Sequence, residues 1–98
     1  MASIIIKLAP QDIKREMYGE RTLPLLQENI SRYVSCSPIN VPFEGEDAAE
    51  EAFDLTNNPS RQTEREQLYG RGPSVSVGDV IDVDGVNYAC LPFGWQVL

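Results

Sequence analysis

The Asp84-Gly85 pair constrains the fold of this chain more than any other feature of the sequence. It separates two runs that are rich in β-branched and apolar residues, Val80–Val83 and Val86–Cys90. An Asp-Gly pair in such a place is typical of a two-residue β-hairpin turn, in which both central residues have positive φ. With a last strand expected at Trp95–Leu98, the sequence predicts a β-meander from Ser74 to Leu98.

The remainder of the chain predicts a mixture of strands and helices. Ala2–Leu8 contains three consecutive isoleucines and predicts a strand, because β-branched side chains suit a pleated, buried surface. Gln11–Tyr18 predicts a helix, since Pro10 suits the first turn and Gly19 suits a left-handed helix end.

The secondary structure of the middle of the chain is less clear from the sequence. Thr22–Arg32 reads as a short helix leading into a strand at about Arg32–Ser37, which Pro38 and Pro42 then close into a loop. Residues 60–69 are compatible with a helix but carry few apolar side chains, so a helix and a mobile loop both stay open. We expect an α+β fold in a single domain, residues 1–98, with a small antiparallel sheet, the C-terminal β-meander and two to three short helices.

A short segment without any basic residue carries the largest concentration of charge. Asp47 and Glu50 have the spacing of a capping box, so we expect a helix to begin at Asp47 and to end before Pro59. Ala49, Ala52 and Phe53 would form its buried stripe. The carboxylates have three interpretations: a solvated helix start, a docking surface for a basic partner, or a metal site, although their spacing matches no calcium loop. They are Glu44, Glu46, Asp47, Glu50, Glu51 and Asp54.

Three arginines and three aromatic residues also allow two interpretations each. Arg61, Arg65 and Arg71 could contact phosphate or an acidic surface, or could pair locally with the acidic helix and with the glutamates beside them. The aromatic residues of the meander are expected in the core, or as a binding anchor if one face stays open. They are Tyr88, Phe93 and Trp95.

Composition argues against most catalytic classes. The chain has no histidine, which removes the commonest general base and the commonest transition-metal ligand. Cys36 and Cys90 are far apart and are expected to be small buried hydrophobic residues. Asp79, Asp82 and Asp84 are explained by turns and a solvent-facing position, and nothing in the sequence predicts their burial. We therefore expect no enzyme activity, no metal and no cofactor.

Net charge and hydropathy limit the kinds of partner that the chain is expected to bind. The formal charge is −7, which disfavours binding to a phosphate backbone and favours a partner with a basic surface. No apolar run approaches the roughly 18 residues of a membrane span, and no secretory leader is recognisable. We therefore expect a cytoplasmic protein that does not bind membranes and for which nucleic acid is an unlikely partner.

The C-terminal half resembles a known family. The run from Arg71 to Ile81, Arg-Gly-Pro-Ser-Val-Ser-Val-Gly-Asp-Val-Ile, is followed by Asp84-Gly85, Tyr88, Cys90 and Gly94-Trp95. This pattern resembles the C-terminal signature of YodL-like proteins, and Ala52–Asn57 is similar to the acidic helix of that family. The resemblance implies a small accessory protein of plasmids, conjugative elements or phages.

Together these observations predict a small acidic protein-binding modulator of the mobile-element type, such as an inhibitor of a host nucleic-acid-handling or defence system. The alternative is a nucleic-acid-binding accessory module that uses Arg61, Arg65 and Arg71 with Trp95. Homodimerisation through an exposed edge of the meander is a further possibility. The candidate partner-binding residues are Glu44, Glu46, Asp47, Glu50, Glu51, Asp54, Arg61, Arg65, Arg71 and Trp95.

Overall fold

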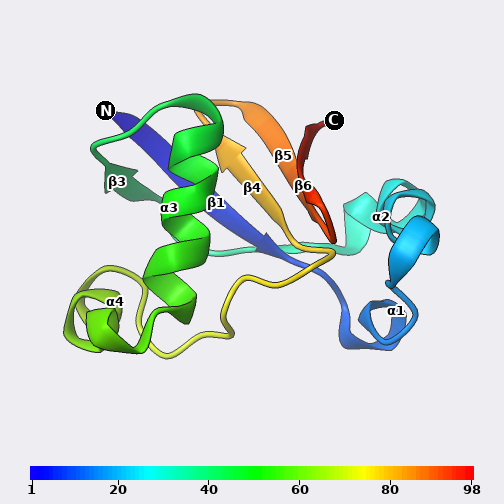
Figure 1. Ribbon diagram of the computed structural model, residues 1–98, viewed down its shortest axis with the longest axis horizontal. Coiled ribbons are helices and arrows are strands. Elements are labelled where there is room, and N and C mark those ends of the chain that lie inside the picture. The colour runs from blue at the N-terminus through cyan, green and yellow to red at the C-terminus, as the bar shows by residue number, and fades with distance from the viewer.

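A computed structural model describes residues 1–98 and shows one antiparallel sheet of six strands (Figure 1). The strand order is β2-β1-β4-β5-β6, and β3 pairs with the first half of β1. The N-terminal strand therefore lies inside the sheet, and β6 forms a free edge. The strands are β1 (Ala2–Leu8), β2 (Val34–Ser35), β3 (Ile39–Val41), β4 (Val80–Val83), β5 (Val86–Leu91) and β6 (Gly94–Val97).

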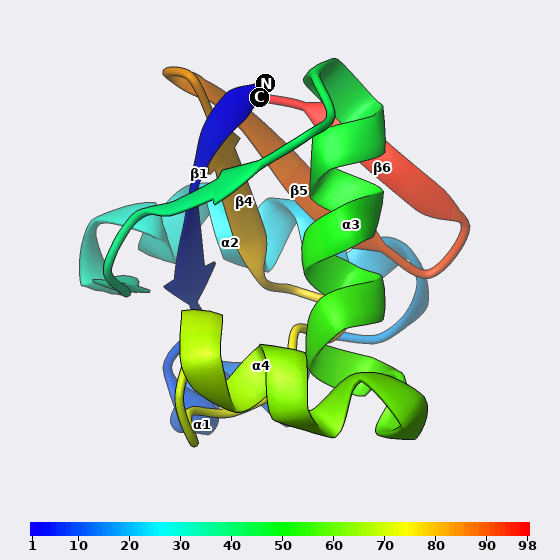
Figure 2. The same cartoon turned by 90° about the vertical axis from the view of Figure 1, so that its left-hand side faces the viewer.

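The structure has four α-helices, which confirms the α+β class and adds one helix to the two to three expected. Figure 2 shows α3 in front of the sheet and α2 behind it, with α4 below α3. None of the helices reaches the length and hydropathy that a membrane span requires. The helices are α1 (Gln11–Lys14), α2 (Thr22–Asn29), α3 (Gly45–Asn57) and α4 (Gln62–Leu68).

The two faces of the sheet carry two separate apolar clusters. On one face, Ile4 and Ile6 of β1 and Ile81 of β4 pack against Ala49 and Ala52 of α3. The small alanine side chains let the helix approach the sheet closely. The other face packs against α1 and α2 through Ile13, Met17, Leu26, Val80, Ala89 and Leu91. Alternation along the strands thus supplies both clusters, as the period of a strand requires.

The central hairpin is confirmed in its local geometry. Asp84 has φ 48° and Gly85 has φ 92°, and Val83 pairs directly with Val86. Positive φ at both central residues is the geometry expected of this turn.

The meander begins later than predicted, at Val80 instead of Ser74. The reason is that the end of α3 captures the backbone of Val75. The Val75 N–H donates to Thr56 Oγ1 at 3.0 Å, and Asn57 Nδ2 donates to the Val75 carbonyl at 2.8 Å. These backbone groups have no need of a strand partner, so the alternating serines and valines form an irregular connection.

Several boundaries predicted from the sequence are wrong. The helix expected at 11–18 ends at Lys14, although Gly19 does adopt positive φ. The loop expected between Pro38 and Pro42 contains β3, because a strand of three residues at the margin of a sheet tolerates flanking prolines. The strand expected at 32–37 shrinks to Val34–Ser35 after a 3-10 turn.

The acidic helix exists, but its start and its inward face differ from the prediction. It begins at Gly45, with Glu44 as the N-cap residue and no side-chain capping bond. Ala49 and Ala52 are fully buried as expected, whereas Phe53 is exposed. Ala48 and Leu55 take its place in the core because they fall on the side of α3 that faces the sheet.

Candidate functional site

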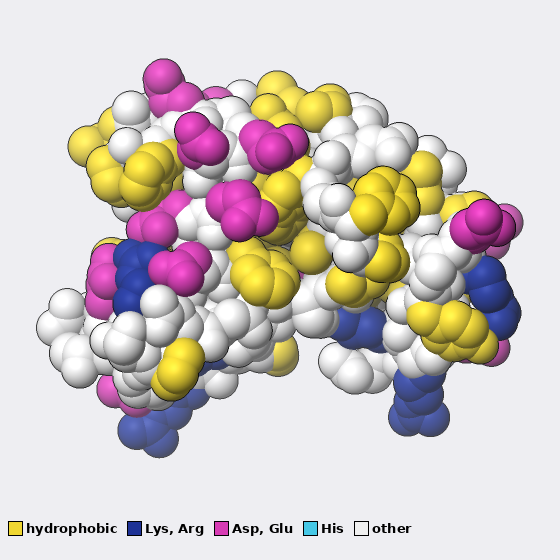
Figure 3. Space-filling model, in the orientation of Figure 1, with side chains coloured by type: hydrophobic (Ala, Val, Ile, Leu, Met, Phe, Trp, Pro, Cys, Tyr) yellow, Lys and Arg dark blue, Asp and Glu magenta, His cyan; other side chains and the backbone are white.

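The outer surface of α3 concentrates exposed carboxylates. The first turn carries Glu46 and Asp47, and the next two turns add Glu50 and Asp54, all of them exposed. Figure 3 shows Asp and Glu side chains gathered over this part of the molecule. We call Glu46, Asp47, Glu50, Glu51 and Asp54 the acidic face; Glu44 lies just before it and approaches the N-terminal amine at 3.9 Å.

One cation is built into the acidic face. Arg61 donates to both carboxylate oxygens of Glu51 at 2.7 and 2.8 Å, and also to Asp54 at 2.8 Å. It pairs with Glu64 in the same way, at 2.9 and 2.7 Å. The hydrogen bond from Arg61 lowers the pKa of the exposed Glu64 carboxyl. The local pairing that the sequence left open is thus confirmed for Arg61, which ties α4 to α3.

The other two arginines are used differently. Arg65 donates to the carbonyls of Thr56 and Gly70, at 3.3 and 2.8 Å, and its guanidinium lies 5.3 Å from the centre of the Tyr69 ring. It therefore holds the connection after α4 in place. Arg71 is exposed and makes no ion pair.

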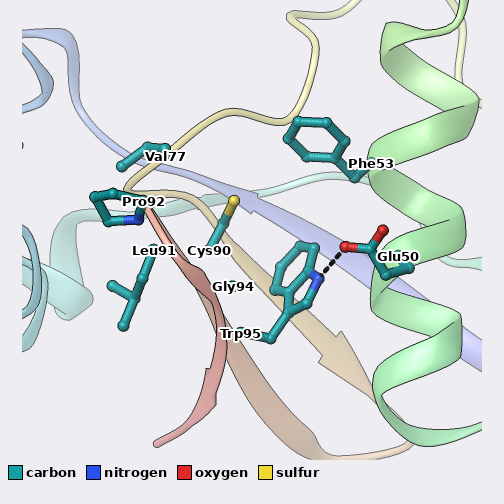
Figure 4. A pocket seen from close by; sticks show the side chains of 8 residues that line it. All are labelled: Glu50, Phe53, Val77, Cys90, Leu91, Pro92, Gly94 and Trp95. Carbon is teal, nitrogen blue, oxygen red and sulfur yellow. Dashed lines mark hydrogen bonds between the residues drawn. The ribbon is translucent and has the colours of Figure 1, made fainter.

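An apolar cleft lies beside the acidic face, between α3 and the turn that joins β5 to β6. Its volume is about 240 Å³. Figure 4 shows Phe53 and Glu50 reaching into it from α3, opposite Pro92 and the ring of Trp95. Trp95 Nε1 donates to Glu50 Oε1 at 2.6 Å, so one wall of the cleft is anchored to the acidic helix. The lining residues are Glu50, Phe53, Val77, Cys90, Leu91, Pro92, Gly94 and Trp95.

Glu50 connects this cleft to a second, shallower hollow. The second hollow is lined by Phe43 and by four carboxylates of the acidic face, Asp47, Glu50, Glu51 and Asp54. An apolar depression and an acidic one therefore share a wall. A ligand that spans both would need an apolar group for the first and a positive charge for the second.

Sequence reasoning found the carboxylates and Trp95 but missed the rest of the cleft. Phe53 was expected in the buried stripe of the acidic helix. Phe93 was expected in the core and is 82% exposed, because it occupies the tip of the β5–β6 turn. Tyr88 and Trp95 are partly buried against the core cluster under α3.

The two cysteines and one aspartate are shielded from solvent to different degrees. Cys90 is buried in the wall of the cleft, and burial raises the pKa of its thiol to about 11. Cys36 is a half-buried free thiol 3.7 Å from the Tyr69 hydroxyl. Asp79, which the sequence explained only by a turn, is fully buried, and four donors from three segments converge on its carboxylate. No group of three or more acidic or thiol side chains is arranged to hold a metal ion.

Comparison of the chain with family models, curated proteins and solved structures finds no match. The resemblance to YodL-like proteins therefore stays a prediction from the sequence.

Proposed function

We propose that this chain is a protein-binding domain that captures a basic segment of a partner on the acidic face of α3 and in the adjoining apolar cleft. The observation that carries the proposal is the shared wall of the two hollows, where Glu50 stands between Phe53 and Trp95 on one side and Asp47 on the other. Aromatic side chains beside charged groups are typical of interface hot spots. The formal charge of −7 would also speed the encounter with a basic partner.

The arrangement of the carboxylates supports a narrower form of the proposal. From Glu46 to Asp54 the acidic face follows nine residues of one helix, and its ends are about 12 Å apart along the helix axis. Phosphates along one nucleic-acid strand recur every ~3.4 Å of helix axis, so this length corresponds to roughly three to four base steps. The partner we favour is therefore a nucleic-acid-handling protein, whose basic groove the acidic face would occupy as an inhibitor of the mobile-element type would.

Nucleic-acid binding through the arginines receives less support. The guanidinium of Arg61 is occupied by three carboxylates, and that of Arg65 by backbone carbonyls and Ser74. Of the three, Arg71 alone remains exposed without a partner. A single cation on a chain of charge −7 is a poor basis for holding a phosphate backbone.

Selection of binding peptides from a random display library would test the proposal. We expect the selected peptides to combine Lys or Arg with an aromatic residue, and their affinity to fall as salt rises. The triple reversal E46K/D47K/E50K should weaken their binding at least about tenfold.

The matched control is E16K/E28K/E66K, which reverses the same number of exposed carboxylates that lie outside α3. Both triple variants change the net charge equally, so a loss in the first variant alone assigns binding to the acidic face. Equal losses in both, or selected peptides without basic residues, would contradict the proposal.

A further inference from the structure

The edge of the sheet formed by β6 has no neighbouring strand. β6 pairs only with β5, and Figure 2 shows it along the margin of the sheet with no element beyond it. Its residues, Gly94-Trp95-Gln96-Val97, include no charge and no proline. Proteins usually protect such an edge with lysine, proline, a bulge or a covering segment, because unpaired strand groups recruit another strand. The opposite margin is protected: it consists of the short strands β2 and β3, with Pro38 and Pro42 beside them.

The hydrogen bonding of β6 identifies the groups that are free. The Leu98 N–H donates to the Asn87 carbonyl at 3.0 Å. Successive residues of an antiparallel strand direct their backbone groups to opposite sides, so Gly94 and Gln96 also face β5. The N–H and C=O groups of Trp95 and Val97 therefore face outward, and no hydrogen bond within the chain uses them.

The two faces of this edge differ in chemistry. On the α3 side, the flank with Glu46 and Glu50 stands beside the edge, and Glu50 contacts the Trp95 indole directly. These two glutamates are four residues apart and share one side of the helix. On the opposite side, Gln96 and the exposed Phe93 line a hollow of about 310 Å³ together with Leu23. A strand added here would meet Glu46 and Glu50 on one face, and on the other a hollow with apolar side chains and one carboxylate, Glu20.

We infer that β6 accepts an extended segment of the basic partner as a seventh strand, with cationic side chains toward α3 and apolar side chains toward α2. The inference rests on the proposed function and specifies how the partner is held. Strand addition takes its affinity from main-chain hydrogen bonds and its specificity from alternate side chains. The sequence of the bound partner segment would therefore alternate Lys or Arg with apolar residues.

Charge argues against a second copy of this chain as the occupant. Two β6 strands pairing antiparallel about a two-fold axis would place both α3 helices on the same face of the joined sheet. The Glu46 and Glu50 flanks would then approach each other, and each copy carries a formal charge of −7. Like charges across such a junction oppose association.

A blocked octapeptide of alternating lysine and valine tests the inference, with the glutamate–valine octapeptide as control. We expect the lysine peptide to bind, the glutamate peptide not to bind, and the Trp95 and Val97 amides to exchange at least about tenfold more slowly in the complex. Val97→Pro removes one outward N–H while leaving the bonds to β5, and should weaken binding at least about tenfold. Val97→Thr keeps the N–H and should bind within about twofold of the unmodified chain.

The outcomes separate this inference from the proposed function. If Val97→Pro still binds the lysine peptide and exchange of the Trp95 and Val97 amides in the unmodified chain is unaltered, strand addition is overturned. In that case, loss of peptide binding in E46K/D47K/E50K would still support the acidic face as the binding surface. No binding of the lysine peptide overturns the inference, whereas the display selection alone decides the proposed function. Amide exchange in the unmodified chain gives the answer even where Val97→Pro is poorly folded. If sedimentation shows self-association and the same amides become protected as the chain associates, the occupant of the edge is a second copy. That result would also overturn the inference.

Discussion

Two regions of the molecule use carboxylates in opposite ways. At the junction where β1 leaves the sheet, the carboxylate of Asp79 is fully buried and receives the Ala9 N–H at 2.9 Å and Lys14 Nζ at 2.6 Å. On the acidic face of α3, Glu46 and Asp47 are exposed and form no ion pair. The single buried carboxylate joins three segments, while the dense cluster leaves much of its charge free. Local density of charge is therefore a poor guide to structural importance, and the number of donors that reach a carboxylate is a better one.

The largest effect should come from Asp79→Asn. The amide keeps the shape of the side chain but leaves the Lys14 ammonium without its counterion in a largely buried place. Breaking a buried pair in this way costs about 3 kcal/mol of unfolding free energy. Urea unfolding measures it, with Asp47→Asn as the matched control, for which we expect a change below about 0.5 kcal/mol. Similar losses of unfolding free energy in the two variants would contradict the difference in structural importance between Asp79 and the acidic face.

A second, smaller effect should come from the residue before Asp79. Gly78 has φ 99°, and an added Cβ would overlap the sulfur of Met17. Gly70 has φ 87° but nothing within 4 Å of the same position. We expect Gly70→Ala to cost about 1 kcal/mol for its backbone alone, and Gly78→Ala to cost about 2 kcal/mol because packing is disturbed as well. Thermal unfolding of both variants checks the difference; equal melting temperatures would show that the junction accommodates the extra methyl group.

The smallest effect concerns the cation inside the acidic face. The hydrogen bond from Arg61 lowers the pKa of Glu64, so its stabilising contribution is present above the ordinary glutamate pKa and is lost as the pH falls through the lowered value. In Arg61→Gln the pKa of Glu64 should rise toward its usual range. A carboxyl-carbon NMR titration measures the shift, with Arg32→Gln as a control that raises the pKa of Asp12 in the same way but leaves Glu64 alone. An unchanged Glu64 titration would show that the pair does not persist in solution.

Features set by neighbouring residues were predictable from the sequence. The Asp84-Gly85 turn depends on the φ of two adjacent residues, and β1 depends on a run of branched side chains, so both were located correctly. The beginning of the meander was not, because the backbone of Val75 is held by Thr56 and Asn57, far away in the sequence. β3 was missed because three residues between prolines carry too little periodicity.

The same distinction between local and long-range features applies to the candidate site. The acidic residues were visible in the sequence because they follow one helix, and local pairing of Arg61 was one of the alternatives considered. The cleft was not predictable, since Phe53 belongs to α3 and Trp95 to β6, and α4, β4 and β5 lie between them in the sequence. The burial of Asp79 was missed for the same reason, as the donors at Ala9 and Lys14 are 70 and 65 residues away.

The inner position of β1 also governs the order in which the protein can be made. Ile4 pairs with Val83, so β1 has to wait for a partner strand that is synthesised 79 residues later. At a translation rate of about 5–20 residues per second, that delay is on the order of ten seconds. During this time the isoleucine-rich strand has only the short strands β2 and β3 as partners, and it is exposed to other nascent chains and to chaperones. High expression levels should therefore favour aggregation of nascent chains, at a stage that the stability of the finished fold does not influence.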